Sequence, residues 1–196
     1  MFRAEPVASM QRALVERATA GDHEAFAQLA TASFPRLFRT AKLILRDSES
    51  AQDAVQDALM QAWRHVRALR DPDSWDAWLH RTIVRACYKV ARKNKRRSLV
   101  ELHVAPDPDT ARAPDASAGI AERDRLGREL DRLDIDQRTV IVLHYYLDLP
   151  LVDVAEILDI PAGTVKSRLH RGLEEMRASM RGAPEANPQL GLERSV

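Results

Sequence analysis

The residues of this 196-residue chain whose type and spacing best suit a chemical role are cations at helical spacing. Eight of them fall within residues 79–97, a stretch without Asp or Glu: Arg81, Arg85, Lys89, Arg92, Lys93, Lys95, Arg96 and Arg97. Like charges on one helix repel each other, so exposure to solvent alone explains them poorly. Neutralisation by a polyanion explains them better, because each phosphate contact releases counterions. The stretch therefore predicts contact with nucleic acid.

A second polar and basic helix face, again without an acid, lies within residues 164–171. The side chains on this face and at its borders are Thr164, Lys166, Ser167, Arg168, His170 and Arg171. A solvated face usually mixes charges of both signs, as Glu174, Glu175 and Arg177 do one turn later. The pattern favours DNA binding. The alternative is an ordinary surface pair of helices, whose outer face would also be polar.

A third candidate surface is acidic. Glu49, Asp53 and Asp57 follow one another at i,i+4 spacing, so their carboxylates line one face of the expected helix. Spacing alone favours a solvated acidic face. The functional alternative is a docking surface for a basic partner protein.

Two tryptophans, Trp75 and Trp78, precede the basic stretch. Core packing is the favoured role for both, and stacking on unpaired bases is the alternative. The single cysteine, Cys87, lies on the apolar side of the same stretch and is expected to be a small buried hydrophobe.

Helical periodicity predicts the elements that carry these residues. In the C-terminal half, residues 152–158 form one short helix, and Asp159-Ile160-Pro161 interrupts it because the residue before proline leaves the α region. The next helix has an inward stripe of Val165, Leu169, Leu173 and Met176. Two short helices with a tight turn, the second basic outward, predict a helix-turn-helix. Asp134 to Gln137 predicts a capping box upstream.

In the N-terminal half we expect a helix over residues 10–19, then two helical pieces divided by Pro35, with Asp22 and Ser33 as their N-caps. Asp47 begins a clear helix, and residues 71–74 form a turn and cap before the basic helix, which is expected to end near residue 97.

The expected fold class is all-α, with two helical domains joined by a flexible acidic linker. Pro106, Pro108 and Pro114 break any helix between the two basic modules, and acids predominate there. The predicted boundaries are 20–97 for the first domain, 98–120 for the linker, 121–181 for the helix-turn-helix domain and 182–196 for a disordered tail.

Composition excludes several classes. The net charge is only +1, so the local charge pattern must carry the argument for nucleic acid. One cysteine excludes an internal disulfide and a Cys-rich zinc site, and the six histidines lack metal-ligand spacing. We expect no metal, no cofactor and no enzymatic activity, because no catalytic constellation is present. No apolar run predicts a membrane span or signal peptide, so a soluble, cytoplasmic protein is expected.

Three motifs, in order, resemble the extracytoplasmic function (ECF) group of bacterial sigma-70 factors. AQDAVQDALMQAW, residues 51–63, is similar to the helix that docks on RNA polymerase in that group. WLHRTIVRACYKVARKNKRR, from Trp78, resembles its promoter −10 recognition helix. IPAGTVKSRLHRG, residues 160–172, looks like its C-terminal helix-turn-helix.

The resemblance implies a protein that binds core RNA polymerase, through the β′ clamp helices and the β subunit, and directs it to promoter DNA. Asp53, Gln56 and Asp57 would contact the clamp helices. The helix-turn-helix residues given above would lie in the major groove at −35. The residues implied for −10 recognition and opening are Trp75, Trp78, Arg81, Arg85, Lys89, Arg92 and Lys93. The linker would thread the RNA channel, and an anti-sigma protein is a possible partner.

The chain departs from the group at several positions. Arg85 and Lys89 stand where many members have Asn and Asp, which bears on −10 preference, and Gly172 replaces a common Ala at a propensity cost of about 1 kcal/mol. Two other function classes stay open. One is a DNA-binding regulator that does not use polymerase; the other is a decoy that binds an anti-sigma protein instead of promoters.

Overall fold

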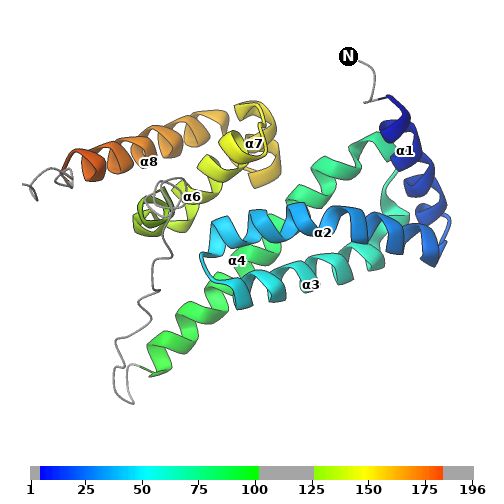
Figure 1. Ribbon diagram of the computed structural model, residues 1–196, viewed down its shortest axis with the longest axis horizontal. Helices are drawn as coiled ribbons and strands as arrows, with labels where there is room; N and C mark the ends of the chain where they lie inside the picture. Colours follow the sequence, from blue (N-terminus) through cyan, green and yellow to red (C-terminus); the bar gives the residue numbers. More distant parts are fainter. Residues whose placement is uncertain (1–4, 102–125, 183–196) are drawn as a thin grey trace, which may run out of the picture.

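The computed structural model describes residues 5–101 and 126–182, and within these ranges the chain is helical, with no strand (Figure 1). The helices form two domains, which confirms the predicted all-α class. The predicted linker, apart from residues 98–101, and the tail from residue 183 lie outside the described residues.

The first domain is a bundle of four helices joined partly by 3-10 turns. Its elements are α1 (Glu5–Thr19), α2 (His23–Leu45), α3 (Ser48–His65), η1 (Val66–Ala68), η2 (Pro72–Ser74) and α4 (Trp75–Glu101). The predicted N-cap at Asp22 and the predicted helix start at Asp47 are confirmed. The Asp22 side chain accepts hydrogen bonds from two backbone N–H groups at the start of α2, and Asp47 accepts one from Ser50 N at the start of α3. Each cap satisfies donors that the first helical turn leaves without an intrahelical partner.

The predicted division at Pro35 is wrong, because α2 runs through this residue without a break. Ser33 is therefore a buried residue inside the helix, not an N-cap. A proline inside a helix costs about 3 kcal/mol. Burial offsets that cost, since α2 continues the same buried stripe on both sides of Pro35, from Leu29 to Leu37 and Ile44, and each such side chain contributes about 1.5–3 kcal/mol.

Helix α4 crosses behind α2 and α3 in the view of Figure 1 and then projects beyond them, at the green end of the ribbon. Ile83, Val84, Cys87 and Val90 are buried, which confirms the expected apolar face. The helix continues to Glu101, four residues beyond the expected end. The 3-10 turn before it is capped by Asp71, as predicted for this segment.

The second domain contains helical residues 126–132, α6 (Ile135–Ile141), the π-helical turn η3 (Val142–Tyr146), α7 (Leu151–Leu158) and α8 (Ala162–Gly182). The predicted capping box is confirmed: Asp134 accepts a hydrogen bond from Gln137 N, and the Gln137 side chain accepts one from Asp134 N. Helix α7 ends where Asp159 adopts a left-handed conformation, with φ of 55°.

Gly172 has a packing role that its low helix propensity does not reveal. A Cβ atom at this position would lie 2.9 Å from Ile141 Cδ1 and 3.3 Å from Gln137 Cβ. Glycine therefore allows α8 to approach α6 closely.

The two domains pack against each other. The guanidinium of Arg138 donates to the carbonyl of Ile44 at 2.8 Å, and Arg46 pairs with Asp131. One continuous apolar core contains buried residues from both domains, including Ile83 of α4 and Val154 of α7. The contact surface therefore includes the sides of α2 and α4 that face the second domain.

Candidate nucleic-acid interface

Helix α8 has a buried side and a basic exposed side, as the periodicity predicts. Val165 is fully buried and Leu169 packs partly against the core. Lys166, His170 and Arg171 are exposed. Neither Lys166 nor Arg171 has an ion-pair partner among the described residues, so both cations are available to an external anion.

The border residues of this face are held by the protein itself. Ser167 Oγ donates to the carbonyl of Thr164 at 2.9 Å. Arg168 Nη2 lies 2.7 Å from Asp136 Oδ2, and the Arg168 side chain is only 26% exposed. The other carboxylate oxygen of Asp136 accepts a hydrogen bond from Tyr88 Oη at 2.7 Å. A residue of the −35 candidate set is thus linked through Asp136 to the −10 candidate helix.

The cations of α4 have several different environments. Arg81 Nη2 donates to the carbonyl of Glu156 in α7 at 2.9 Å, and Lys89 Nζ lies 2.8 Å from Asp57 Oδ2 in α3. Arg92 Nε donates to the carbonyl of Tyr88 at 3.3 Å. Arg85 and Lys93 are exposed and have no ion pair within the described ranges. The basic stretch is therefore partly engaged at the domain contact and partly open to solvent.

The two tryptophans have different roles. Trp75 is 1% exposed and packs edge-on against Phe26 with ring centroids 6.3 Å apart, which confirms core packing. Trp78 is half-buried, with its ring centroid 5.6 Å from that of Trp75. Its remaining surface faces a hollow between α3, α4 and the segment that joins them.

This hollow, called the cleft below, has a volume of about 830 Å³, which is in the range of ligand sites. It is lined by Gln61, His65, Ala68, Leu69, Arg70, Asp71, Ser74, Trp78, Thr82, Arg85, Ala86 and Lys89. An aromatic face and two cations on one wall suit an unpaired nucleotide, because the base can stack and the phosphate can pair. Sequence reasoning did not find the cleft, since its other wall comes from residues 68–74, whose fold the periodicity of the helices does not define.

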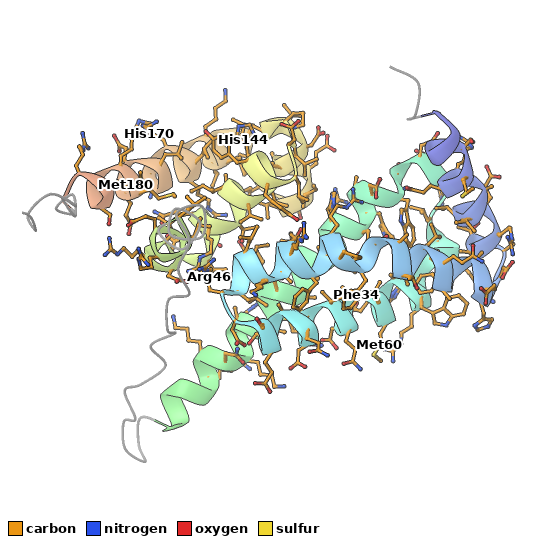
Figure 2. All side chains as sticks on the ribbon, viewed as in Figure 1. Phe34, Arg46, Met60, His144, His170 and Met180 are labelled. Atoms are coloured by element: carbon orange, nitrogen blue, oxygen red, sulfur yellow. The ribbon has the colours of Figure 1, made fainter. Side chains whose placement is uncertain are left out.

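The acidic face of α3 is adjacent to the basic helix. Asp53 and Gln56 are exposed, whereas Asp57 is partly buried and paired with Lys89. One turn further along, Met60 is 46% exposed, and Phe34 on α2 is 43% exposed (Figure 2). The outer surface of α2 and α3 therefore combines carboxylates with exposed apolar side chains.

Buried groups of α4 are excluded from contact with nucleic acid. Burial raises the pKa of the Cys87 thiol to about 12, so the residue is an inert apolar side chain, as expected. Burial, together with the nearby Arg36 charge, lowers the pKa of His80 to about 4. Neither ring nitrogen of His80 has a hydrogen-bond partner within the described structure. His80 is thus a neutral imidazole with unsatisfied polar atoms at neutral pH.

No group of three His, Cys, Asp or Glu side chains among the described residues is arranged to hold a metal ion. No described helix has the length and apolar character needed to cross a membrane.

Comparisons with known proteins agree on one group. Residues 29–97 match the family model for sigma-70 region 2, and residues 123–176 match that for sigma-70 region 4. The ECF RNA polymerase sigma factor SigM of Mycobacterium tuberculosis is 36% identical over 152 residues, which cover 78% of this chain and 75% of that protein. SigW of Bacillus subtilis, also an ECF sigma factor, is 27% identical over 177 residues, covering 85% and 95%.

A solved structure has a similar fold. The sigma factor RpoE of Bartonella quintana, crystallised with the anti-sigma factor NepR, superposes with a TM-score of 0.66 at 26% identity. The match covers 80% of this chain and 97% of that one.

Proposed function

Because this chain belongs to the ECF group of the sigma-70 family, it directs core RNA polymerase to specific promoters, and we propose which of its surfaces make each contact. The proposal assigns −35 reading to α8, −10 reading to α4 with the cleft, and polymerase docking to the acidic face of α3. The single observation that carries the −10 assignment is that Arg85 and Lys89 of α4 share a wall of the cleft with Trp78.

At −35, Thr164, Lys166, Ser167, His170 and Arg171 contact the major groove directly, and Arg168 borders the same face, where its ion pair with Asp136 holds it back from DNA. Support comes from the buried Val165 on the opposite side, which fixes the direction in which the polar face points. Lys166 pairs with phosphate, and Arg171 reads a base edge.

At −10, the exposed cations of α4 follow the DNA backbone, and the cleft takes one base from the separated strand. Arg85 and Lys89 line the cleft beside Trp78 and would pair with phosphates on either side of that base. Trp75, which is 1% exposed, supports the position of Trp78 and does not touch DNA. Arg81, Arg92 and Lys93 extend the basic surface along the same helix.

Docking uses Asp53, Gln56 and Asp57 against Arg or Lys side chains of the β′ clamp helices, with further contacts to the β subunit. Charge-assisted pairs that lose water on binding contribute far more than exposed pairs. The acidic linker passes through the RNA channel, and the protein acts in the cytoplasm as a factor without a catalytic centre of its own. By analogy with RpoE and NepR, a protein inhibitor of the anti-sigma type is a further partner.

The test adds the purified protein to core polymerase and measures promoter-dependent transcripts. Asp53→Arg combined with Asp57→Arg should abolish binding to core enzyme, and Asp53→Arg alone, which leaves the Lys89 pair intact, should weaken it strongly. The matched control is Glu24→Arg, because Glu24 is an exposed acid of the same bundle outside the docking face. If the double variant co-purifies with core enzyme at the wild-type yield, the docking assignment is wrong. Core binding without promoter-dependent transcripts would instead support a decoy.

A further inference from the structure

The segment between α3 and α4 forms one wall of the cleft. Residues 68–71 and Ser74 line it from this side. The segment has internal hydrogen bonds: the Asp71 carboxylate accepts one from Ser74 Oγ at 2.7 Å and one from Asp73 N at 3.1 Å. These bonds lower the pKa of Asp71, so its carboxylate stays ionised at neutral pH. We call residues 68–74 the rim.

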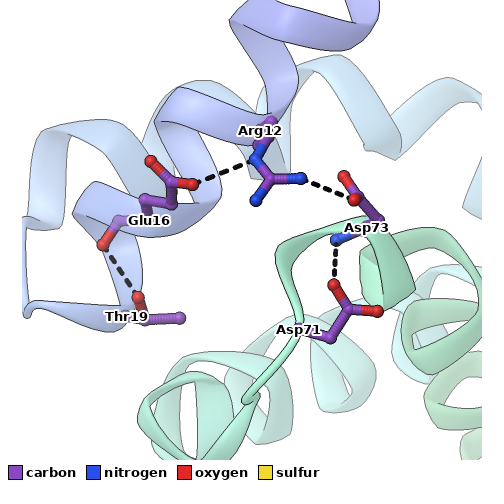
Figure 3. Close-up of polar contacts among 5 residues, drawn as sticks. All are labelled: Arg12, Glu16, Thr19, Asp71 and Asp73. Atoms are coloured by element: carbon purple, nitrogen blue, oxygen red, sulfur yellow. Dashed lines mark hydrogen bonds and ion pairs between the residues drawn. The ribbon is translucent and has the colours of Figure 1, made fainter.

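The rim is held from its other side by the N-terminal helix. Arg12 of α1 places Nη1 2.6 Å from Asp73 Oδ2, while its Nε lies 3.1 Å from Glu16 Oε1 (Figure 3). Asp73 does not line the cleft, whereas its neighbour Ser74 does. The Arg12–Asp73 pair is therefore a contact behind the wall that a bound base would not touch.

Two further observations place α1 and the turn after it beside the same region. Gln11 Nε2 donates to Asp76 Oδ2 at 3.2 Å, in the first turn of α4. Gly21, which follows α1 and has φ of 98°, lies so close to Arg67 that a Cβ atom would be 2.8 Å from its Nη2. Helix α1 is itself fixed by the fully buried Val15 and Ala18. It can thus act as a rigid support for the rim.

We propose that α1 sets the base selectivity of the cleft, with Arg12 as the positioning residue that fixes the rim through Asp73. The inference rests on the proposed function of the cleft in −10 recognition. Helix α1 lies outside both regions that match the family models, the first of which begins at residue 29. It also lies at the end of the molecule far from the helix-turn-helix domain (Figure 1). Its effect should therefore be confined to −10 selectivity.

The expected effect is modest, because both partners are about half exposed and exposed ion pairs are weak. Holoenzyme made with the full chain is tested on promoters that carry each of the four bases at successive −10 positions. Arg12→Ala and Asp73→Asn should each lower the preference for the best base at one position about threefold. The double variant should lose no more than either single variant, since both remove the same contact.

Controls separate positioning from general weakening. Glu16→Gln removes the other partner of Arg12 and should leave the base preference unchanged. Arg12→Lys keeps a cation beside Asp73 and should retain part of the preference that Arg12→Ala loses. Preference at −35 should remain as in the wild type for all variants. A lower melting temperature without a change in the −10 preference would overturn the inference.

Trp78→Leu separates the role of the cleft from that of Arg12, because it changes the cleft directly. If Trp78→Leu alters base preference and Arg12→Ala does not, the positioning role is wrong while the cleft assignment stands. If Trp78→Leu leaves every preference unchanged, the cleft is not a base site, and the role of Arg12 falls with it.

Discussion

Helices α4 and α8 both carry basic residues assigned to promoter DNA, but the protein holds these residues in different ways. On α8, Lys166 and Arg171 extend from one side of a short helix pair and have no ion pair within the described structure. On α4, Arg81 and Lys89 are engaged by a carbonyl of α7 and a carboxylate of α3. Under the proposed assignment, the cations of α8 can meet a duplex groove directly, whereas Arg81 and Lys89 of α4 must exchange internal partners for DNA.

This difference indicates two ways of reading DNA. A convex helix face reads base edges from outside a closed duplex. A cleft beside a partly buried tryptophan can accept a base only after the base has left the stack. We therefore propose that the cations of α4 serve strand separation as well as affinity, and the mutations described next test this division.

The largest effect should follow removal of the α4 cations. Replacing Arg85, Lys89 and Arg92 with Ala should reduce open-complex formation roughly a hundredfold, because three charge-assisted contacts to phosphate are lost. Permanganate reactivity of unpaired thymines measures the open complex. A pre-melted promoter should restore only the part of the defect that lies in strand opening. An unchanged permanganate pattern would remove α4 from the mechanism.

The next effect distinguishes two cations within α8. Arg171→Ala should relax the preference at one or two −35 positions by about 1–3 kcal/mol, as expected when a bidentate contact to guanine is lost. Lys166→Ala should weaken all −35 variants alike and lower the salt slope by about one. Binding of holoenzyme to single-base −35 variants at two salt concentrations measures both. Uniform losses for both variants would assign −35 specificity to DNA shape instead.

The sequence predicted the elements whose signal is local. The cap at Asp22, the helix start at Asp47, the capping box at Asp134 and the stripe through Val165 depend on neighbours within one or two helical turns, and all are confirmed. The predicted break at Pro35 is wrong because burial on both sides outweighs the local preference of proline for a break, and no local pattern reveals that burial.

The sequence predicted which residues form the candidate sites, but not the partners that surround them in the structure. Periodicity identified the cations of α4, yet the partners of Arg81 and Arg168 come from residues 75 and 32 positions away in the chain. The cleft depends on residues 68–74, and its support depends on Arg12, 61 positions from Asp73. From the sequence, Gly172 only lowers helix propensity. Its packing role depends on the close approach of Ile141, a residue of another helix, which no local pattern reveals.

A smaller effect concerns His80, a buried titratable residue near the start of α4. The buried residues of α8 include no titratable side chain. The pKa of His80 is about 4 in the folded chain and about 6.5 when unfolded, so below pH 6.5 the unfolded state binds more protons. The free energy of unfolding should therefore fall by about 1.3 kcal/mol between pH 7.5 and pH 5.5. Urea titrations at the two pH values measure this, with Arg36 and Asp76 left unchanged. His80→Leu should remove the difference, and an equal fall in that variant would assign it to other groups.

The smallest effect tests whether the ion pair with Asp136 keeps Arg168 of α8 away from DNA. Asp136 pairs with Arg168 and accepts a hydrogen bond from Tyr88, so Asp136→Asn should release Arg168 toward the major groove. Removal of any acid near the DNA strengthens binding through the general field, so the matched control is Asp153→Asn, an exposed acid of the same domain without an ion pair in the described structure. We expect −35 affinity to rise about threefold more with Asp136→Asn than with Asp153→Asn, which corresponds to about 0.7 kcal/mol. The extra gain should depend on the base at one −35 position, because a guanidinium released from Asp136 can read a base edge. Equal gains for the two variants would mean that Asp136 acts only through its charge and that Arg168 already reaches DNA in the wild-type protein.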